Sequence, residues 1–373
     1  MKVTKWVVFG VFCALLCGCG KQVENEGIPV VELSKTKGEI DLKLSDLLEN
    51  IRVIPLETRP DVLLPGHFST WVGEKYIVTL GEDAIHLFTI DGKYVRKLAQ
   101  QGRGPDEYLY AVNFCVDKQE RYGYLTSGVN YICVIDLEKG GIVRKISTGK
   151  HIPYELWYSD RDSTLVYAPT LTKDSPDCDI CRIALDGTLL HTVEKNTEAD
   201  WGNRSYLWGL NDTIRYKTQY SDTLLLLADT VMIPYCRFVT ERPFSTITGR
   251  GKAVGVLFEN RDRLIFSNDE IITQKEEWGI SSIIKHCGNY VLNKSDFSLR
   301  KLKSFYLDIF DYKTDFIVNL LTGKRIGIEI NVLAFKELLK DKLDNPLIPE
   351  YVKELYSRLN EEDNPVLLVG DIK

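Results

Sequence analysis

The side chains that could do chemistry do not form a known catalytic or metal-binding motif. Cys178-Asp-Ile-Cys181 is a single Cys-x-x-Cys pair with no second pair and no nearby histidine in the sequence, whereas a structural zinc site takes four such ligands. If this segment is a strand, residues three apart point to opposite faces, so a disulfide would need the strand to break. We therefore expect no metal and no cofactor, and expect most cysteines after residue 19 to be buried thiols.

The sequence also lacks the common motifs of nucleophilic and acid–base catalysis. The sequence contains neither Gly-x-Ser-x-Gly nor His-Glu-x-x-His, the spacings that present a serine nucleophile or two zinc-binding histidines. The histidines are scattered among strand and turn signals, at His67, His86, His151, His191 and His286. Because catalytic triads are assembled in space, an enzyme is kept as an alternative. The sequence favours a binding or scaffolding role.

Aromatic side chains form the first candidate binding surface. They gather in two stretches, Tyr154, Trp157, Tyr158 and Tyr167, then Trp201, Tyr206, Trp208, Tyr216 and Tyr220. Flat rings stack on sugars or anchor a protein partner, and packing between adjacent sheets uses the same residue types. Trp208 lies in an apolar segment and is expected in the core. Trp201 lies beside Asp200 and Gly202, so we expect it to be exposed and take it as a candidate ligand-binding residue.

A glycine-rich segment, Gln101-Gly-Arg-Gly-Pro-Asp-Glu-Tyr108, holds the second candidate surface. Its Gly and Pro residues favour a sharp turn between two repeats. Arg103, Asp106 and Glu107 could instead form a polar ligand-binding cluster at that turn. Both interpretations place the three charged residues at a corner of the fold.

The elements that must position these residues are short strands in a regular repeat. Residues 88–98 alternate apolar and polar positions on either side of Asp91-Gly92, which is a strong hairpin signal. The pattern returns at 134–146 and 182–193, after 46 and 48 residues. A period of this size, with several strands in each unit, is typical of β-propeller blades.

One complete unit contains four predicted strands, at residues 111–117, 122–126, 130–136 and 142–147. The 270 residues from 51 to 320 hold about six such units. We therefore expect an all-β fold, a six-bladed β-propeller over residues 46–330. Residues 51–57 form a strand left over before the first full unit, and we expect it to close the ring by pairing with the last unit.

The glycine-rich turn also carries a family resemblance. Residues 101–108 resemble the Gly-x-Gly-Pro-Gly-Glu-Tyr signature of six-bladed β-propeller lipoproteins of Gram-negative anaerobes, which are related in pattern to NHL-type and TolB-like propellers. The resemblance runs from about residue 45 to the C-terminus. Asp106 replaces the usual glycine, and Asp also tolerates turn conformations. The resemblance implies the propeller fold and an envelope location.

The N-terminus resembles the signal of a bacterial lipoprotein. Lys2 and Lys5 precede an apolar run at 6–16 that is too short to span a bilayer, which needs roughly 20 apolar residues. Leu16-Cys-Gly-Cys19 resembles a lipobox, in which the cysteine takes a diacylglycerol. We expect residues 1–18 to be removed, Cys19 to be lipidated, and residues 19–45 to tether the domain to a membrane, with the outer membrane favoured.

The C-terminal region has a helical spacing. Two amphipathic helices are predicted by apolar residues at helical spacing, first Val332, Phe335, Leu338 and Leu339, then Tyr351, Val352, Leu355, Tyr356 and Leu359. A predicted strand at 366–369 follows. We expect residues 331–373 to form a short C-terminal helical appendage packed on the propeller.

Net charge restricts the partners. The chain carries −6 at neutral pH, and loss of Lys2 and Lys5 with the signal makes it −8. Binding to phosphate backbones requires clustered Lys and Arg, so we expect no nucleic-acid partner. We expect a membrane-anchored module that binds a glycan, peptide or protein. The alternative is a propeller hydrolase or lyase acting on a carbohydrate or lactone at the central channel. Carboxylates or histidines that converge at the channel mouth would favour this alternative.

Overall fold

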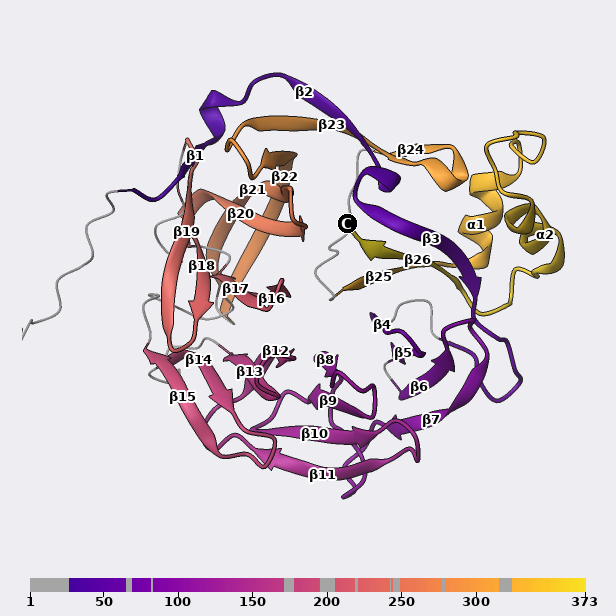
Figure 1. Cartoon of the computed structure of the whole chain (residues 1–373), viewed down its shortest axis with the longest axis horizontal. Helices are drawn as coiled ribbons and strands as arrows, with labels where there is room; N and C mark the ends of the chain where they lie inside the picture. The colour runs from indigo at the N-terminus through magenta and orange to yellow at the C-terminus, as the bar shows by residue number, and fades with distance from the viewer. Residues whose placement is uncertain are drawn as a thin grey trace, which may run out of the picture.

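Six β-sheets surround a common centre in the computed structural model of the chain, and each sheet forms one blade (Figure 1). The structure describes residues 27–64, 69–81, 83–170, 178–194, 205–218, 221–241, 243, 249–276, 279–314 and 324–373. Most strands in the middle of the sheets are buried along nearly their whole length, and the edge strands carry more exposed residues. The predicted all-β, six-bladed propeller is therefore confirmed.

The first three blades are regular four-stranded antiparallel sheets. Their strands are β4 (Ser69–Val72), β5 (Tyr76–Leu80), β6 (Ala84–Thr89) and β7 (Tyr94–Gln100), then β8 (Asn113–Val116), β9 (Tyr122–Thr126), β10 (Tyr131–Asp136) and β11 (Ile142–Ser147), then β12 (Pro153–Ser159), β13 (Thr164–Pro169), β14 (Cys178–Ile183) and β15 (Leu189–Glu194). The three predicted hairpins are β6–β7, β10–β11 and β14–β15. Gly92 in the first of these turns has a φ of +80°, which a residue with a side chain rarely adopts.

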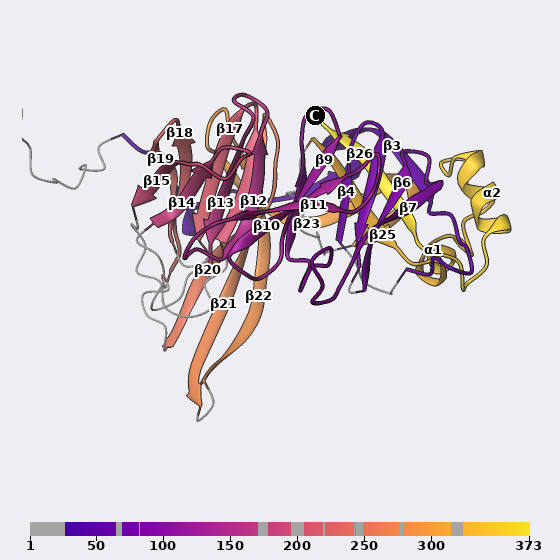
Figure 2. The ribbon, with the colours of Figure 1, turned by 90° about the horizontal axis from the view of Figure 1, so that it is seen from below.

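The fourth blade has one strand more than the first three blades, and the fifth blade has two more. Their antiparallel strands are β16 (Ser205–Leu210), β17 (Thr213–Thr218), β18 (Thr223–Ala228) and β19 (Val231–Val239), then β20 (Gly249–Glu259), β21 (Arg263–Glu276), β22 (Gly279–Asn293), β23 (Leu299–Leu307) and β24 (Tyr312–Thr314). The hairpin of β21 and β22 projects well beyond the other blades (Figure 2).

One of the additional strands in each of these two blades comes from the N-terminal segment. β1 (Val30–Glu32) pairs in parallel with β19, and β2 (Glu39–Lys43) pairs in parallel with β23. The prediction that residues 19–45 form a tether is therefore wrong from Val30 onward. Each of these strands is too short to show an apolar period, although Val31, Leu33, Leu42 and Leu44 are all buried.

The sixth blade closes the ring with both ends of the chain. β26 (Val366–Ile372) lies between β25 (Arg325–Ile330) and β3 (Leu48–Pro55), and it pairs with both in antiparallel fashion. The predicted closure by residues 51–57 is confirmed, with β3 ending at Pro55.

Two short helices, α1 (Val332–Leu339) and α2 (Glu350–Arg358), are inserted between β25 and β26 at the rim of the ring (Figure 1). The predicted boundary at residue 331 therefore cuts through a blade, because β26 belongs to the sheet. The side chain of Asn331 caps α1 by accepting a hydrogen bond from Ala334 N. Phe335 packs edge-on against Phe310, so the helices cover the fifth and sixth blades.

The hydrophobic core lies between adjacent blades. Large side chains from neighbouring sheets interdigitate there, including the fully buried Tyr124, Tyr167, Tyr216 and Phe266. Trp208 is also buried, as predicted, and Trp201 lies outside the described residues. No helix within the described ranges is long and apolar enough to cross a membrane.

Candidate functional site

The innermost strands enclose a cavity of about 750 Å³ at the centre of the propeller. Its wall is formed mainly by β4, β8 and β12, the inner strands of three consecutive blades, which Figure 1 shows side by side around the centre. Arg325 of β25 and Asp371 of β26 contribute from the closing blade. A concave space of this volume fits a small-molecule ligand.

Aromatic rings form part of the cavity wall. Trp71 on β4, Phe114 on β8 and Trp157 on β12 are all partly buried and line the cavity. Trp157 lies directly against Gly209 of β16, where an added Cβ would come within 2.3 Å of its ring atom Cζ2. A larger residue at position 209 would displace this ring, so the glycine determines where Trp157 lies.

Glu155 and Asn113 form a hydrogen-bonded pair in the same wall. Asn113 Nδ2, on β8, donates to Glu155 Oε2, on β12, over 2.9 Å. Burial raises the pKa of Glu155 to about 8, and the hydrogen bond from Asn113 opposes that rise only in part. At neutral pH the carboxyl group therefore keeps its proton in most molecules and can both donate and accept hydrogen bonds.

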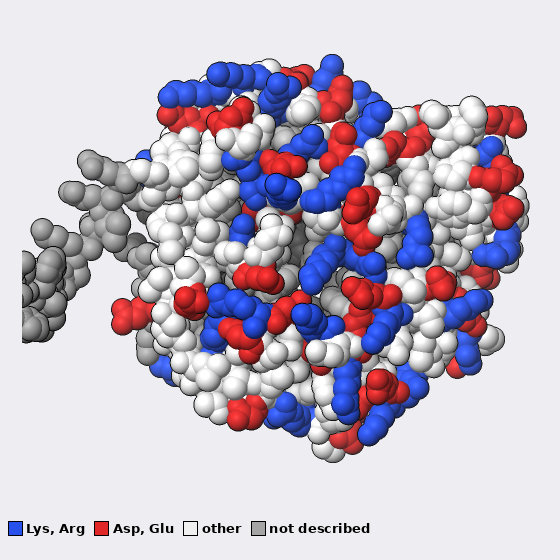
Figure 3. All heavy atoms as spheres, in the orientation of Figure 1, with Lys and Arg blue, Asp and Glu red and all other residues white. Residues whose placement is uncertain are grey.

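Charged pairs occupy other parts of the cavity wall. Lys324 Nζ lies 3.1 Å from Asp160 Oδ2, and Arg325 is paired with Asp371. Arg325 Nη1 also donates to Gly73 O over 2.6 Å, which fixes the guanidinium between two blades. Figure 3 shows Lys, Arg, Asp and Glu side chains of both signs around the centre of one face. Within each pair the charges compensate one another, but the lining as a whole contains more acidic than basic residues, which disfavours an anionic ligand.

The glycine-rich corner lies away from this cavity. Glu107 accepts hydrogen bonds from Gly104 N and Gln100 Nε2, both over 2.8 Å, and the pKa of Glu107 is lowered by the Gln100 bond and then by the Gly104 bond. Arg103 and Asp106 are exposed. The geometry matches the turn interpretation, and ligand binding by Arg103, Asp106 and Glu107 stays a prediction.

Two candidate residues cannot be placed. Cys19, the predicted lipidation site, and Trp201, the predicted aromatic ligand-binding residue, both lie outside the described residues. The sequence analysis missed Glu155 and Asn113. The sequence does point to Glu155, because it is a single acid inside the apolar and aromatic strand 153–158.

The Cys-x-x-Cys pair departs from the strand geometry that was expected of it. β14 pairs Cys178 with Glu194 and Ile180 with Val193, so Asp179 is an extra residue in a β-bulge. The two sulfur atoms consequently lie on the same side, 3.3 Å apart. The expectation of no nearby histidine was also wrong, since His151 Nδ1 lies 3.1 Å from Cys181 Sγ.

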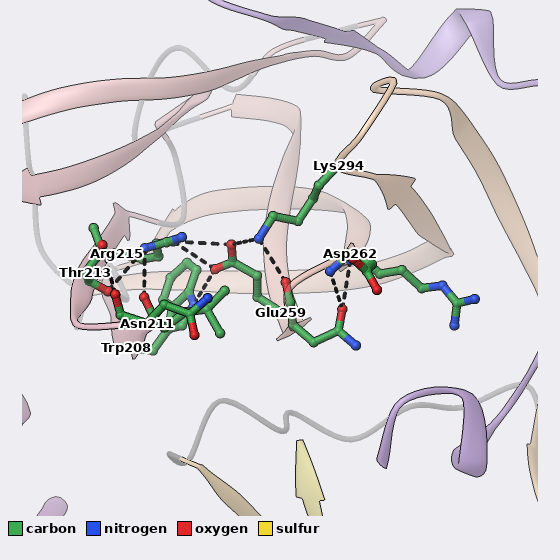
Figure 4. A network of polar contacts seen from close by, with 10 residues as sticks. Trp208, Asn211, Thr213, Arg215, Glu259, Asp262 and Lys294 are labelled. Carbon is green, nitrogen blue, oxygen red and sulfur yellow. Dashed lines mark hydrogen bonds and ion pairs between the residues drawn. The ribbon is translucent and has the colours of Figure 1, made fainter. Parts of the chain in front are cut away.

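A second polar cluster joins the fourth and fifth blades. Glu259 is fully buried and accepts hydrogen bonds from Trp208 Nε1, Arg215 Nε and Lys294 Nζ at 2.8, 3.1 and 2.7 Å. Figure 4 shows Arg215 and Lys294 approaching the carboxylate from opposite sides. Three donors occupy the carboxylate oxygens of Glu259, so this cluster connects strands of the two blades.

Comparisons with known proteins agree with the fold. A crystal structure of a "Putative exported protein" from Bacteroides fragilis NCTC 9343 has a TM-score of 0.61 and 14% sequence identity, covering 92% of this chain and 99% of that one. Identity this low shows a shared fold and no more. No curated protein matches the chain. The sequence profile described as "Domain of unknown function (DUF4934)" matches residues 27–371, and the chain therefore belongs to the DUF4934 family.

Proposed function

We propose that the chain is a lipid-anchored envelope protein whose propeller binds a neutral glycan in the central cavity. The observation that carries this proposal is the Glu155–Asn113 pair inside an aromatic wall. A protonated carboxyl and an amide offer donors and acceptors to hydroxyl groups, and the rings of Trp71 and Trp157 offer faces for stacking on a sugar. Peptides and proteins are the other ligand classes that such a cavity admits.

Glycan-array screening with the full-length chain, followed by calorimetry on the best-bound oligosaccharide, tests the binding function. Asn113→Ala removes one hydrogen-bond partner and should weaken binding roughly fivefold, since a neutral hydrogen bond contributes about 1 kcal/mol. Glu107→Gln at the outer corner is the matched control and should bind like the wild type. Loss of binding in Glu107→Gln with none in Asn113→Ala would move the site to the corner.

The raised pKa of Glu155 favours a second function, a hydrolase or lyase that acts on a carbohydrate or lactone. A carboxyl group protonated at neutral pH is what a general acid requires. Glu155→Gln separates the two functions, because the amide keeps hydrogen-bonding groups and cannot deliver a proton. If the protein only binds its ligand, Glu155→Gln still binds and neither it nor the wild type forms product. If the protein is an enzyme, the wild type forms product and Glu155→Gln does not.

The anchor is proposed on the lipobox resemblance and is supported by the neighbour's description as exported. Cys19→Ser should abolish lipidation and release the chain from membranes, because the acyl chains on Cys19 are the proposed anchor. Membrane fractionation with mass spectrometry of the N-terminal peptide measures this. Membrane retention of an unacylated Cys19→Ser chain would contradict the proposal.

A further inference from the structure

Three side chains with soft or borderline ligand atoms converge inside the third blade, away from the central cavity. His151, Cys178 and Cys181 are all buried, and one ligand atom from each lies within 4.8 Å of the others. His151 Nε2 lies 3.9 Å from Cys178 Sγ, while Nδ1 lies 3.1 Å from Cys181 Sγ. Neither the family nor the proposed glycan-binding function accounts for this cluster.

Local backbone features bring these residues together. The β-bulge at Asp179 turns both cysteine side chains to one side of β14. His151 precedes β12 in a tight turn, in which His151 N donates to Thr148 O and Thr148 Oγ1 donates to His151 O over 2.6 Å. Tyr167 Oη, on β13, lies 3.2 Å from His151 Nδ1 and orients the imidazole.

We propose that His151, Cys178 and Cys181 form a buried binding site for a thiophilic d¹⁰ cation, either Cu⁺ held by the three side chains or Zn²⁺ with a water molecule as its fourth ligand. Thiolate and imidazole are the ligands that these ions prefer. Two thiolates bound to one tetrahedral ion at about 2.3 Å are about 3.8 Å apart, whereas disulfide sulfurs are about 2.05 Å apart. The observed 3.3 Å lies nearer to the metal-bound separation.

Binding of the ion displaces the protons of both thiols to solvent, and the neutral imidazole coordinates through one nitrogen. No electron transfer is involved. The bound ion would connect β14 to the turn before β12, so it would hold the outer and inner parts of the third blade together. The site is therefore expected to stabilise the blade and to be independent of ligands in the central cavity.

Metal analysis of the reduced full-length chain tests the proposal. The protein is reduced and purified anaerobically, incubated with Zn²⁺ or Cu⁺ in separate samples, dialysed, and analysed by elemental mass spectrometry. We expect about one equivalent of one of the two ions per chain, and an increase in melting temperature on its addition. Co²⁺ substitution should give sulfur-to-cobalt charge-transfer absorption, which reports thiolate ligation directly.

Variants assign the ligands. Cys181→Ser should bind the ion at least tenfold more weakly, and His151→Gln should do the same while leaving both thiols in place. Cys133→Ser is the matched control, because Cys133 is buried in the second blade and lies outside the cluster. Circular dichroism without metal shows whether each variant is folded. If Cys181→Ser does not fold, a folded His151→Gln variant is enough to test ligation.

Two outcomes would overturn the proposal. The first is that the wild-type chain retains neither ion after reduction, whether or not the protein was isolated with a Cys178–Cys181 disulfide. The second is that Cys133→Ser loses as much metal as His151→Gln, which would assign the ion to adventitious thiol binding.

Discussion

At the scale of single residues, Glu155 makes stability depend on pH. Its pKa rises from 4.5 to about 8 on folding, so the folded state binds a proton that the unfolded state has released. The bound proton's contribution to folding stability is complete below pH 4.5 and is lost as the pH rises through 8. Glu155→Gln removes this dependence of stability on pH. Its melting temperature relative to that of the wild type should therefore increase between pH 5 and pH 9, as differential scanning calorimetry would show.

A constant difference between Glu155→Gln and the wild type across that range would contradict the assignment. Lys217 is the competing group, because it is fully buried and burial lowers its pKa to about 7. Its effect has the opposite sign, with stability increasing as the pH rises from 7 to 10.5. Since Lys217 is present in both proteins, the comparison cancels it.

Asn364 is the second residue with a testable role, because it fixes the loop that follows β3. Its side chain accepts a hydrogen bond from Leu64 N over 2.8 Å and donates to Glu57 O and Val62 O, both over 2.9 Å. Asn364→Ala removes all three bonds at a buried position. We expect a loss of about 3 kcal/mol in the free energy of unfolding by urea denaturation.

The exposed Asn360 provides a control for this variant. Asn360→Ala should change the free energy of unfolding by less than about 0.5 kcal/mol, as surface substitutions usually do. Equal effects of the two substitutions would show that the Asn364 side chain does not hold the loop.

Residue-level prediction from the sequence succeeded where the local pattern carried the information. Trp208 lies in an apolar strand, and it is buried. The environment of Glu155 depends on Asn113 from the neighbouring blade, which no local pattern shows. The convergence of Cys178 and Cys181 depends on one extra residue in a strand, and alternation alone predicts the opposite arrangement.

At the scale of elements, the buried Glu259 cluster connects β16, β17, β20 and the turn after β22. Glu259→Gln leaves Arg215 and Lys294 without their anion in a buried site. We expect a loss of about 3–5 kcal/mol in the free energy of unfolding, because an uncompensated buried charge is costly. Urea denaturation of the purified variant measures it.

Glu270→Gln is the matched control for this prediction. It breaks the pair between Glu270 and Arg250 at the protein surface, and it should lower the free energy of unfolding much less than Glu259→Gln does, because water screens an exposed ion pair. Similar losses in the two variants would mean that the Glu259 cluster contributes no more than a surface ion pair.

Element prediction was most accurate for hairpins and least accurate for isolated strands. The Asp-Gly and Gly-Gly turns identified β6–β7, β10–β11 and β14–β15, because positive-φ turns leave a clear signal. β1 and β2 have three and five residues, and their pairing partners are more than 200 residues away. The sequence predicted the two helices. It did not predict that they are inserted within the sixth blade, because this position depends on the strands with which β26 pairs.

At the scale of the whole molecule, residues 30–55 run across the fourth, fifth and sixth blades as β1, β2 and β3. Deletion through residue 26 should leave the melting temperature unchanged. Deletion through Lys43 removes two edge strands and the buried Val31 and Leu33, so it should lower the melting temperature. Deletion through Pro55 also removes the closing strand, and it should abolish the cooperative transition in thermal unfolding followed by circular dichroism.

The graded order of the three truncations is the essential result. Equal melting temperatures for the deletions through Lys43 and Pro55 would show that β3 does not close the ring. An unchanged melting temperature after deletion through Lys43 would show that β1 and β2 contribute nothing to the blades.

The pairing of β3 with β26 also determines when the molecule can be completed during its synthesis. β3 ends at Pro55 and β26 begins only at Val366. The ribosome therefore makes these two pairing strands far apart in time. Until β26 has been made, β3 keeps an unpaired strand edge, which invites aggregation and proteolysis. The ring can close only after β26 has been made, so the other blades must form while the ring is still open.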